Sequence, residues 1–270
     1  DAAIERLEAI HERGEPREAA DAGFAQRKAR LLDDFRFIAA CNLGSEHMDE
    51  ADRERVRRIA GQRWLRHFDN RLGLAHDERR RFEATPAPEL PVWEPLLADQ
   101  PHHRIAWPGG VAPATGERFN LRPREHLYDQ GEVYNLNIPY GTLTPEERFK
   151  INEHIIQTIQ MLEQLPFPAH LRRVPEYAGT HHETLTGTGY PLGLSATQLS
   201  VPARIMAIAD IFEALTASDR PYKGLKTLSE SVRLLARFRD SGHIDPVLFE
   251  LFLTSGVYRA YAERFLLPEQ

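Results

Sequence analysis

The sequence predicts an all-α fold, in which a helical bundle follows an additional N-terminal helical region. Two observations support this prediction. Apolar residues recur at helical spacing through most of the chain, and no convincing alternation of apolar and polar residues marks a strand. Helix-start signals also recur in the second half, at Thr144, Thr227 and Asp245.

The first 85 residues predict the N-terminal helical region, which we interpret as a sensor linker or a dimerisation part. Helices are expected over 2–12, 16–40 and 49–69, with a break at Gly14-Glu15-Pro16. The third helix is supported by apolar residues near helical spacing, namely Val56, Ile59, Ala60, Trp64 and Phe68. Charged helices of this kind often self-associate, which makes a homodimer one expectation.

Residues 86–123 differ in composition, because prolines and glycines are dense there. Prolines at this density prevent long helices, since each one removes a backbone donor and clashes with the preceding turn. We therefore predict a connector that holds at most a short helix.

Residues 124–270 predict an all-helical domain with helices near 145–163, 201–218, 227–240 and 245–265. Thr144-Pro145-Glu146-Glu147 and Thr227-Leu228-Ser229-Glu230 each have the pattern of a capping box, the first with proline at the first helical position. Asp245-Pro246 starts the last helix in a similar way.

Composition limits the classes of partner. The net charge is −6 and the pI is about 6.1, which argues against binding DNA or RNA through a basic surface. No apolar run reaches the roughly 18–20 residues of a membrane span, so no membrane is expected for this segment. Cys41 is the single cysteine, which favours a reducing, cytoplasmic location. The chain starts at Asp1, and we expect it to be a fragment of a longer protein.

The adjacent histidines His181 and His182 are the strongest sign of a metal site, because buried imidazoles need polar partners. His154 falls on the helical face expected to be buried, and Asp210 lies among apolar residues of the 201–218 segment. A core histidine satisfied by a backbone carbonyl and an aspartate paired with a buried arginine are the alternatives. Together the four residues form a nitrogen and oxygen ligand set that suits iron, manganese, nickel or zinc.

Residues 126–223 resemble the HD-GYP family, bacterial phosphodiesterases that open cyclic di-GMP and are built on the all-helical HD fold. Three stretches of the sequence carry the resemblance: Leu143-Thr144 with Glu147 and His154; His181-His182-Glu183 through Gly187-x-Gly189-Tyr190-Pro191; and Ala203-Arg204-Ile205 through Asp210, Ala214-Leu215 and Arg220-Pro221-Tyr222-Lys223. The resemblance implies metal-dependent hydrolysis of cyclic di-GMP or a related cyclic dinucleotide, with one or two transition-metal ions per chain, iron or manganese first.

The resemblance also implies roles for individual residues. The metal ligands would be Asp129, His154, His181, His182 and Asp210. Tyr190, Arg220 and Lys223 would contact the substrate, the last two through phosphate oxygens. Asp129, Glu183 and Lys223 would be the catalytic residues, with Glu183 orienting an imidazole rather than binding the metal.

The sequence departs from the family pattern at three positions. Tyr128 stands where the family has the histidine of its His-Asp pair, and Glu132 stands in place of a lysine. Thr186 stands where an aspartate is usual. A glutamate near the substrate would repel the charged phosphate, so we expect weak hydrolysis.

Three functions therefore remain open at this point. The first is a cyclic-dinucleotide phosphodiesterase with attenuated activity. The second is a catalytically weak or inactive module that keeps a metal and senses a cyclic dinucleotide, or binds a signalling protein through the Gly-Tyr-Pro loop. The third is a helical domain with no metal, in which ordinary hydrogen bonds satisfy the histidines.

Overall fold

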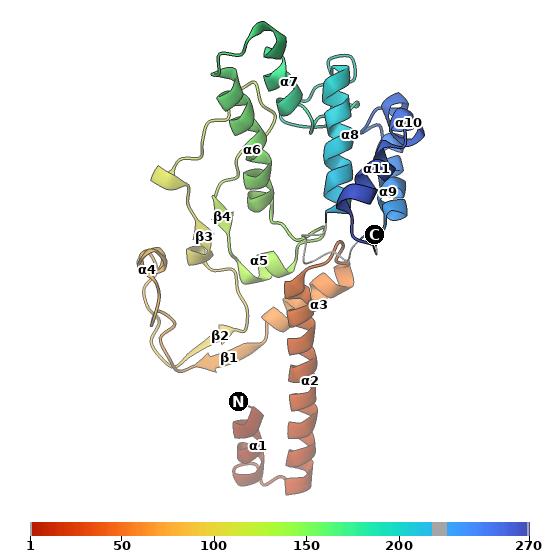
Figure 1. Cartoon of the computed structure of the whole chain (residues 1–270). Helices are drawn as coiled ribbons and strands as arrows, with labels where there is room; N and C mark the ends of the chain where they lie inside the picture. Colours follow the sequence, from red (N-terminus) through yellow and green to blue (C-terminus); the bar gives the residue numbers. More distant parts are fainter. Residues whose placement is uncertain (1, 218–225, 269) are drawn as a thin grey trace. The chain divides into compact units, whose positions relative to one another are not determined.

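The computed structural model describes residues 2–217, 226–268 and 270, which form two compact units (Figure 1). Unit 1 comprises Asp1–Val111 and Glu125–Glu146, and unit 2 comprises Ala112–Arg124 and Glu147–Gln270. The expected segment boundaries at residues 85 and 123 stay predictions.

Unit 1 begins with two helices that lie side by side, α1 (Ala2–His11) and α2 (Arg17–Leu43). Both agree with the predicted helices to within a few residues. Ion pairs between Arg6 and Asp21 and between Arg27 and Glu5 connect the two helices. The other helices of the unit are α3 (Glu50–Ala60), α4 (His76–Phe82) and α5 (Glu132–Leu136).

The third predicted helix, over 49–69, is too long. It ends at Ala60, because Gly61 terminates it and the chain then enters strand β1 (Arg63–Arg66). Trp64 therefore lies in a strand, and Phe68 is exposed. Aromatic residues favour strands when a partner strand is available, and that partner is distant in sequence.

Short strands are present where none was predicted. β1 pairs antiparallel with β2 (Val92–Pro95), and β3 (Arg104–Ile105) pairs antiparallel with β4 (Tyr128–Asp129). Strands of two to four residues are too short for alternation to be recognised in the sequence. The proline-rich stretch otherwise contains only short helical turns, η1 (Pro101–His103) and η2 (Pro108–Gly110), so the absence of long helices within 86–123 is confirmed.

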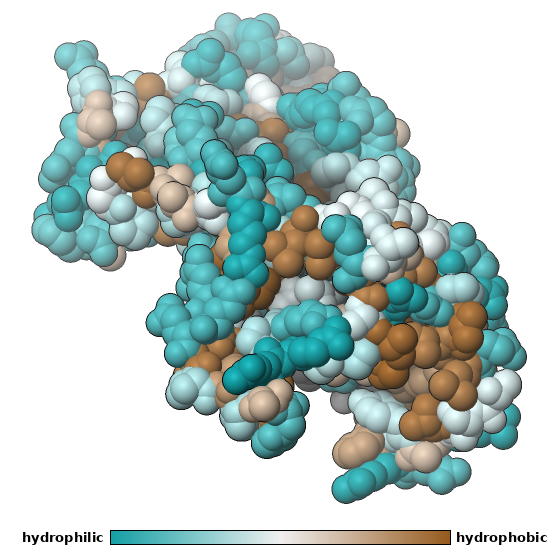
Figure 2. Space-filling view, turned by 90° about the horizontal axis from the view of Figure 1, so that it is seen from above, coloured by the Kyte–Doolittle hydropathy of each residue, from teal (hydrophilic) through white to brown (hydrophobic). Residues whose placement is uncertain are grey.

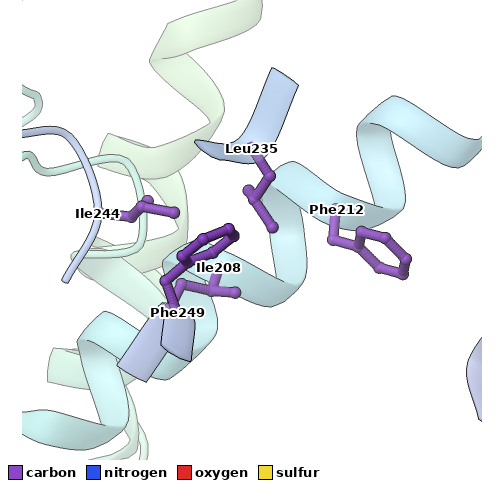
Figure 3. Close-up of a cluster of buried hydrophobic side chains, with 5 residues drawn as sticks. All are labelled: Ile208, Phe212, Leu235, Ile244 and Phe249. Carbon is purple, nitrogen blue, oxygen red and sulfur yellow. The ribbon is translucent and has the colours of Figure 1, made fainter. Parts of the chain in front are cut away.

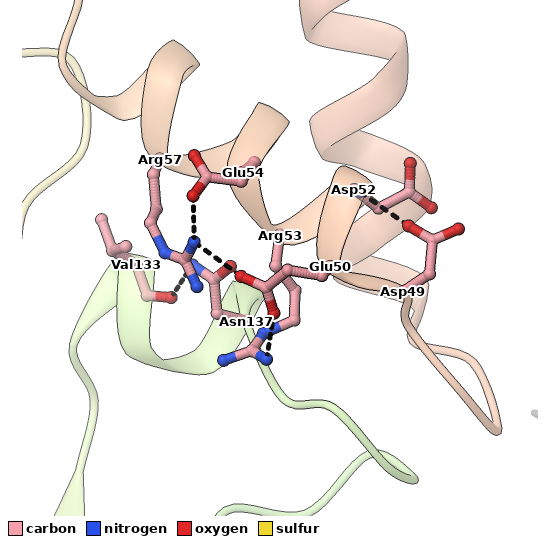
Figure 4. A network of polar contacts seen from close by, with 8 residues as sticks. All are labelled: Asp49, Glu50, Asp52, Arg53, Glu54, Arg57, Val133 and Asn137. Carbon is pink, nitrogen blue, oxygen red and sulfur yellow. Dashed lines mark hydrogen bonds and ion pairs between the residues drawn. The ribbon is translucent and has the colours of Figure 1, made fainter.

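The start of α3 carries a network of polar contacts (Figure 4). The Asp49 carboxylate caps the helix by accepting from the Asp52 backbone N–H at 2.8 Å. Glu50 pairs with Arg53 at 2.7 Å and with Arg57 at 2.9 Å. Glu50 and Arg57 are exposed and Arg53 is partly exposed, so each pair contributes only about 0–1 kcal/mol to stability. The backbone cap is the main local determinant of the helix start.

The second half of the chain is helical, as predicted. Its helices are α6 (Pro145–Glu163), η3 (Ala169–Leu171), α7 (Val174–Gly179), α8 (Val201–Thr216), α9 (Leu228–Asp240), α10 (Pro246–Thr254) and α11 (Val257–Phe265). The segment predicted as one helix over 245–265 is two helices. Gly256 separates them with a φ of +70°, a conformation that costs little energy only for glycine.

The predicted start signals of α9 and α10 are confirmed. The Thr227 hydroxyl accepts from the Glu230 backbone N–H at 3.2 Å, and the Glu230 carboxylate accepts from the Thr227 N–H at 2.8 Å. Asp245 accepts from the backbone N–H groups of Val247 and Leu248 at 2.9 and 3.1 Å. These caps fix where both helices begin.

Unit 2 contains two hydrophobic clusters. The first joins α8 to the helices that follow it, and Figure 3 shows its five buried side chains: Ile208, Phe212, Leu235, Ile244 and Phe249. The second contains Phe119 with Ile155, Ile156 and Ile159 of α6. Each fully buried aliphatic or aromatic side chain contributes about 1.5–3 kcal/mol, so these clusters hold the helices that carry the candidate site residues.

Arg204 of α8 connects three segments of unit 2. One guanidinium nitrogen lies 2.8 Å from the Asp245 carboxylate at the start of α10. The other two nitrogens donate to the backbone carbonyls of Ala196 and Leu199. The arginine thus fixes the loop before α8 against the cap of α10.

The face shown in Figure 2 is mostly hydrophilic, with separate hydrophobic patches. Exposed apolar side chains include Val247 and Leu251 of α10. Single exposed apolar residues are ordinary on a folded protein. None of the described helices combines the length and the hydrophobicity needed to cross a lipid bilayer.

Candidate metal centre

Three imidazoles converge in unit 2. His154 is on α6, and His181 and His182 follow the short helix α7. One ring nitrogen from each lies within 4.8 Å of the others. The rings of His181 and His182 are 4.1 Å apart between centroids, and His154 lies edge-on to His182 at 5.3 Å. The structure therefore brings together the three histidines that the sequence singles out.

Backbone contacts define the protonation of two of these rings. His154 Nδ1 lies 2.6 Å from the Ile151 carbonyl oxygen, and His181 Nδ1 lies 2.8 Å from that of Ala178. A carbonyl oxygen can only accept, so Nδ1 carries the proton in both residues. In the neutral form of such a ring Nε2 keeps a lone pair, which is the state that a metal ligand requires. The predicted alternative, satisfaction by a backbone carbonyl, thus accounts for only one nitrogen of each ring.

The side chain of His182 is 20% exposed. Burial and the neighbouring His181 lower its pKa to about 4, so the ring is neutral near pH 7. Its Nε2 is buried and has no hydrogen-bond partner among the described residues. A buried polar atom without a partner costs about 1–3 kcal/mol. A metal ion bound here would remove that cost, so the residues present fit such an ion.

Asp210 lies beside this cluster but is less buried than predicted. Its Oδ2 is 3.9 Å from His182 Nδ1, and 42% of its side chain is exposed. The buried residues of α8 are Ala203, Ala207, Ile208, Phe212 and Thr216, and Asp210 is not among them. The alternative of a buried arginine partner is therefore not needed, because solvent reaches the carboxylate.

The predicted burial of His154 is also wrong. Helix α6 buries Phe149, Glu153, Ile155, Ile156 and Ile159, whereas Ile151 and His154 are exposed. The buried face of α6 is rotated by about one position from the predicted face, because Phe119 and its neighbours pack against Ile155 and Ile159. His154 lies outside that buried face, and its exposed ring is 5.3 Å from the ring of His182 between centroids.

The Gly-Tyr-Pro loop packs directly against the histidine pair. A Cβ atom at Gly189 would lie 2.5 Å from Glu183 Cα and 2.6 Å from the His182 carbonyl oxygen, so only glycine fits there. The Tyr190 N–H donates to that carbonyl at 3.2 Å. The Tyr190 ring stacks on the His182 ring with centroids 4.8 Å apart. Burial, followed by the nearby Asp210, raises the pKa of Tyr190.

Glu183 has a different role from the predicted one. Its Oε1 accepts from the backbone N–H groups of Leu192 and Gly193 at 2.6 and 3.1 Å, and its Oε2 accepts from Leu194 at 2.9 Å. Its residue is only 1% exposed. Both oxygens are thus used by the loop, and the expectation that Glu183 orients an imidazole is wrong. The sequence could not show this, because the partners are backbone atoms.

Thr186, where an aspartate was expected from the resemblance, belongs to a cluster of hydroxyl groups. Its Oγ1 lies 3.0 Å from that of Thr184 and 2.9 Å from that of Thr188. The Thr188 backbone N–H donates to Thr184 Oγ1 at 3.0 Å. The three threonines hold the start of the loop without an added charge.

Sequence reasoning missed three residues at this site. Asn120 holds the Gly-Tyr-Pro loop, because its side-chain amide donates to the Gly189 carbonyl at 2.8 Å. A cavity of about 280 Å³ is lined by His181, His182, Tyr190 and Asp210, and also by Phe238 and His243. None of the three missed residues lies in a local motif, so only their position in space identifies them.

The other predicted residues belong to unit 1 or lie outside the described residues. Asp129 belongs to unit 1, where its carboxylate accepts from the Gly131 N–H at 2.9 Å and lies 3.5 Å from Arg104 Nε. Glu132, also in unit 1, accepts from the Ala98 N–H at 2.8 Å. Arg220 and Lys223 lie outside the described residues.

The family model described as HD domain matches residues 92–248, which is more than half of the chain. The chain is 35% identical over 147 residues to a 3′3′-cGAMP-specific phosphodiesterase of Vibrio cholerae, covering 50% of this chain and 32% of that protein.

Two further relatives have related names. A cyclic di-GMP phosphodiesterase of Pseudomonas aeruginosa is 44% identical over 79 residues, covering 29% of this chain and 18% of the relative. A cyclic di-GMP phosphodiesterase of Thermotoga maritima is 38% identical over 131 residues, covering 47% of this chain and 34% of the relative. The chain thus spans about a third or less of the length of these relatives.

Proposed function

The chain belongs to the HD domain family as an HD-GYP member, and on this premise we propose that it is a metal-dependent phosphodiesterase that hydrolyses a cyclic dinucleotide. The observation that carries this proposal is the convergence of His154, His181 and His182. One ring nitrogen of each histidine lies within 4.8 Å of the others, and the buried Nε2 of His182 has no hydrogen-bond partner among the described residues.

In this proposal the three histidines and Asp210 hold a first-row transition-metal ion. Nitrogen and oxygen ligands without sulfur suit iron or manganese first, with nickel or zinc as alternatives, and one or two ions per chain. When bound, such an ion lowers the pKa of a water molecule and polarises the phosphodiester.

The residues of the chain position the substrate. The cavity beside His181 and His182 receives the phosphodiester next to Tyr190, whose stacked ring keeps His182 in place. Glu183 acts as a positioning residue, because it fixes the loop that carries Tyr190. Arg220 and Lys223 supply the positive charge that holds the phosphate oxygens, as guanidinium and ammonium groups do.

The names of the relatives suggest two substrates to test, cyclic di-GMP and 3′3′-cGAMP. Because Tyr128 and Glu132 depart from the family pattern, we propose that turnover is slow. The same two residues favour a second function, in which the chain keeps a metal and senses a cyclic dinucleotide without hydrolysing it, or contacts a signalling protein through the Gly-Tyr-Pro loop.

The test combines metal content with turnover. Protein purified without chelators is analysed by element-resolved mass spectrometry, and products from each dinucleotide are separated by chromatography. We expect bound metal and slow hydrolysis, both lost in His182→Ala. His170→Ala is the matched control, because His170 is an exposed histidine of η3 in the same unit.

The outcomes separate the two functions. Metal with no turnover identifies the sensor, and absence of metal from wild-type protein refutes both. A rise in rate in Tyr128→His would show that the altered pair limits hydrolysis.

A further inference from the structure

The cavity beside the three imidazoles has lining residues that the proposed hydrolysis does not use. Phe238, near the end of α9, and His243, in the turn before α10, line it together with His181, His182 and Asp210. We infer that Phe238 and His243, which we call the α9 wall, recognise a nucleobase of the cyclic dinucleotide. This inference rests on the proposed function and adds to it the part of the substrate that the α9 wall contacts.

The α9 wall is held in a defined position. The His243 backbone N–H donates to the Phe238 carbonyl at 2.9 Å, and the two rings meet edge-on with centroids 5.2 Å apart. The next residue, Ile244, is 1% exposed and belongs to the hydrophobic cluster of Figure 3. Asp245 then caps α10 and pairs with Arg204. A ring fixed by its backbone on both sides can contact a ligand with little loss of conformational freedom.

The His243 side chain is available for a ligand. It is half-buried, and none of the described residues forms a hydrogen bond with its imidazole. Burial lowers the pKa of His243, so the neutral ring offers one N–H donor and one nitrogen acceptor near pH 7. The edge of a purine presents donors and acceptors of the same kind.

The rest of the cavity also suits a base. Ile211, Ala214 and Leu215 of α8 provide an apolar lining beside the Phe238 ring. Bases bind to proteins by contact of their flat faces with aromatic and apolar side chains and by hydrogen bonds at their edges. The volume of about 280 Å³ lies near the lower end of the range for ligand pockets, about 300–1,000 Å³, which fits one base and its phosphate rather than a whole cyclic dinucleotide.

The test compares His243→Phe, which keeps a ring but removes both nitrogens, with His243→Gln, which keeps a donor and an acceptor. Metal content, kcat and KM are measured for cyclic di-GMP and 3′3′-cGAMP. Methyl p-nitrophenyl phosphate is measured in parallel, because it is a phosphodiester without a base. We expect His243→Phe to raise KM for both dinucleotides about tenfold, as loss of one buried hydrogen bond does. His243→Gln should raise it less than about threefold.

Each result decides the inference. The raised KM of His243→Phe is assigned to the base if two conditions hold. The metal content is unchanged, and the rate for methyl p-nitrophenyl phosphate stays within about twofold of that of the wild type. An unchanged KM for the dinucleotides in His243→Phe overturns the inference, as does an equal loss with the base-free substrate. If the wild type hydrolyses no phosphodiester, the proposed function fails, and binding of cyclic di-GMP is measured by calorimetry instead. Binding by His243→Phe that is at least tenfold weaker than that of the wild type supports the α9 wall. Equal binding by the two proteins, or no binding by the wild type, refutes it.

Discussion

Replacing Glu183 tests how the Gly-Tyr-Pro loop is held against the histidine pair. In Glu183→Ala, the backbone N–H groups of Leu192, Gly193 and Leu194 all lose their acceptor. In Glu183→Gln, one oxygen remains for Leu192 and Gly193, but the new amide group faces the Leu194 N–H with a donor of its own. The alanine substitution should therefore destabilise the protein more than the glutamine substitution. Glutamine also has nearly the same side-chain volume as glutamate.

The magnitude follows from the number of lost bonds. A buried N–H without an acceptor costs about 1–3 kcal/mol. Three such groups give a cost of at least about 3 kcal/mol for the alanine variant, and one gives about 1–3 kcal/mol for the glutamine variant. In a chain of this size, about 3 kcal/mol lowers Tm by roughly 6–12 °C.

Thermal unfolding followed by circular dichroism, together with metal content, measures this effect. The control is Glu250→Ala, which removes an exposed glutamate from α10. We expect the highest Tm for the wild type and the control, a lower Tm for the glutamine variant and the lowest for the alanine variant. The alanine variant should also lose its metal, because the loop moves away from His182. Equal Tm values and equal metal content in all four proteins would show that Glu183 does not hold the loop.

Three further predictions concern the same unit. Gly189→Ala should abolish metal binding while leaving the far-UV spectrum helical, because its Cβ would overlap the backbone of Glu183 and Thr184; normal metal content would contradict this. In metal-free protein, the pKa of His182 is about 4 in the folded state, below its value of about 6.5 in the unfolded chain. The neutral ring therefore contributes about 3 kcal/mol to the free energy of unfolding above pH 6.5, and this contribution is lost as the pH falls toward 4. Urea titrations across this range should show a smaller pH dependence in His182→Phe. Phe249→Ala should cost about 3–5 kcal/mol in urea unfolding, because Phe249 is 1% exposed in the core cluster; a cost below about 1 kcal/mol would contradict that packing.

The helices of the second half could be predicted because their signals are local. Thr227 and Asp245 cap α9 and α10 through residues two or three positions away, and those partners are visible in the sequence. The strands could not be predicted, since β1 pairs with a segment about thirty residues later and each strand is four residues or fewer. The break at Gly256 was missed because an isolated glycine is also tolerated inside helices.

In the candidate site, too, residues with a local signal could be predicted and residues that act through distant contacts could not. The histidine pair and His154 were identified from residue type and motif, and the structure brings them together. Burial was predicted less well, because the exposed fractions of His154 and Asp210 depend on which face each helix presents to its neighbours. Asn120, Phe238 and His243 act through contacts between distant segments, which no spacing along the chain reveals.

Arg204 belongs to a motif that carries the family resemblance, and its contacts lie within the fold. All three of its guanidinium nitrogens are engaged, two by carbonyls and one by the Asp245 carboxylate, so the charge is neutralised within the scaffold. Lysine could not replace it, because a single ammonium cannot reach three acceptors in three directions. Anion binding in this chain therefore requires a cationic side chain whose donors are not already bound to the protein. Arg204 does not meet this requirement.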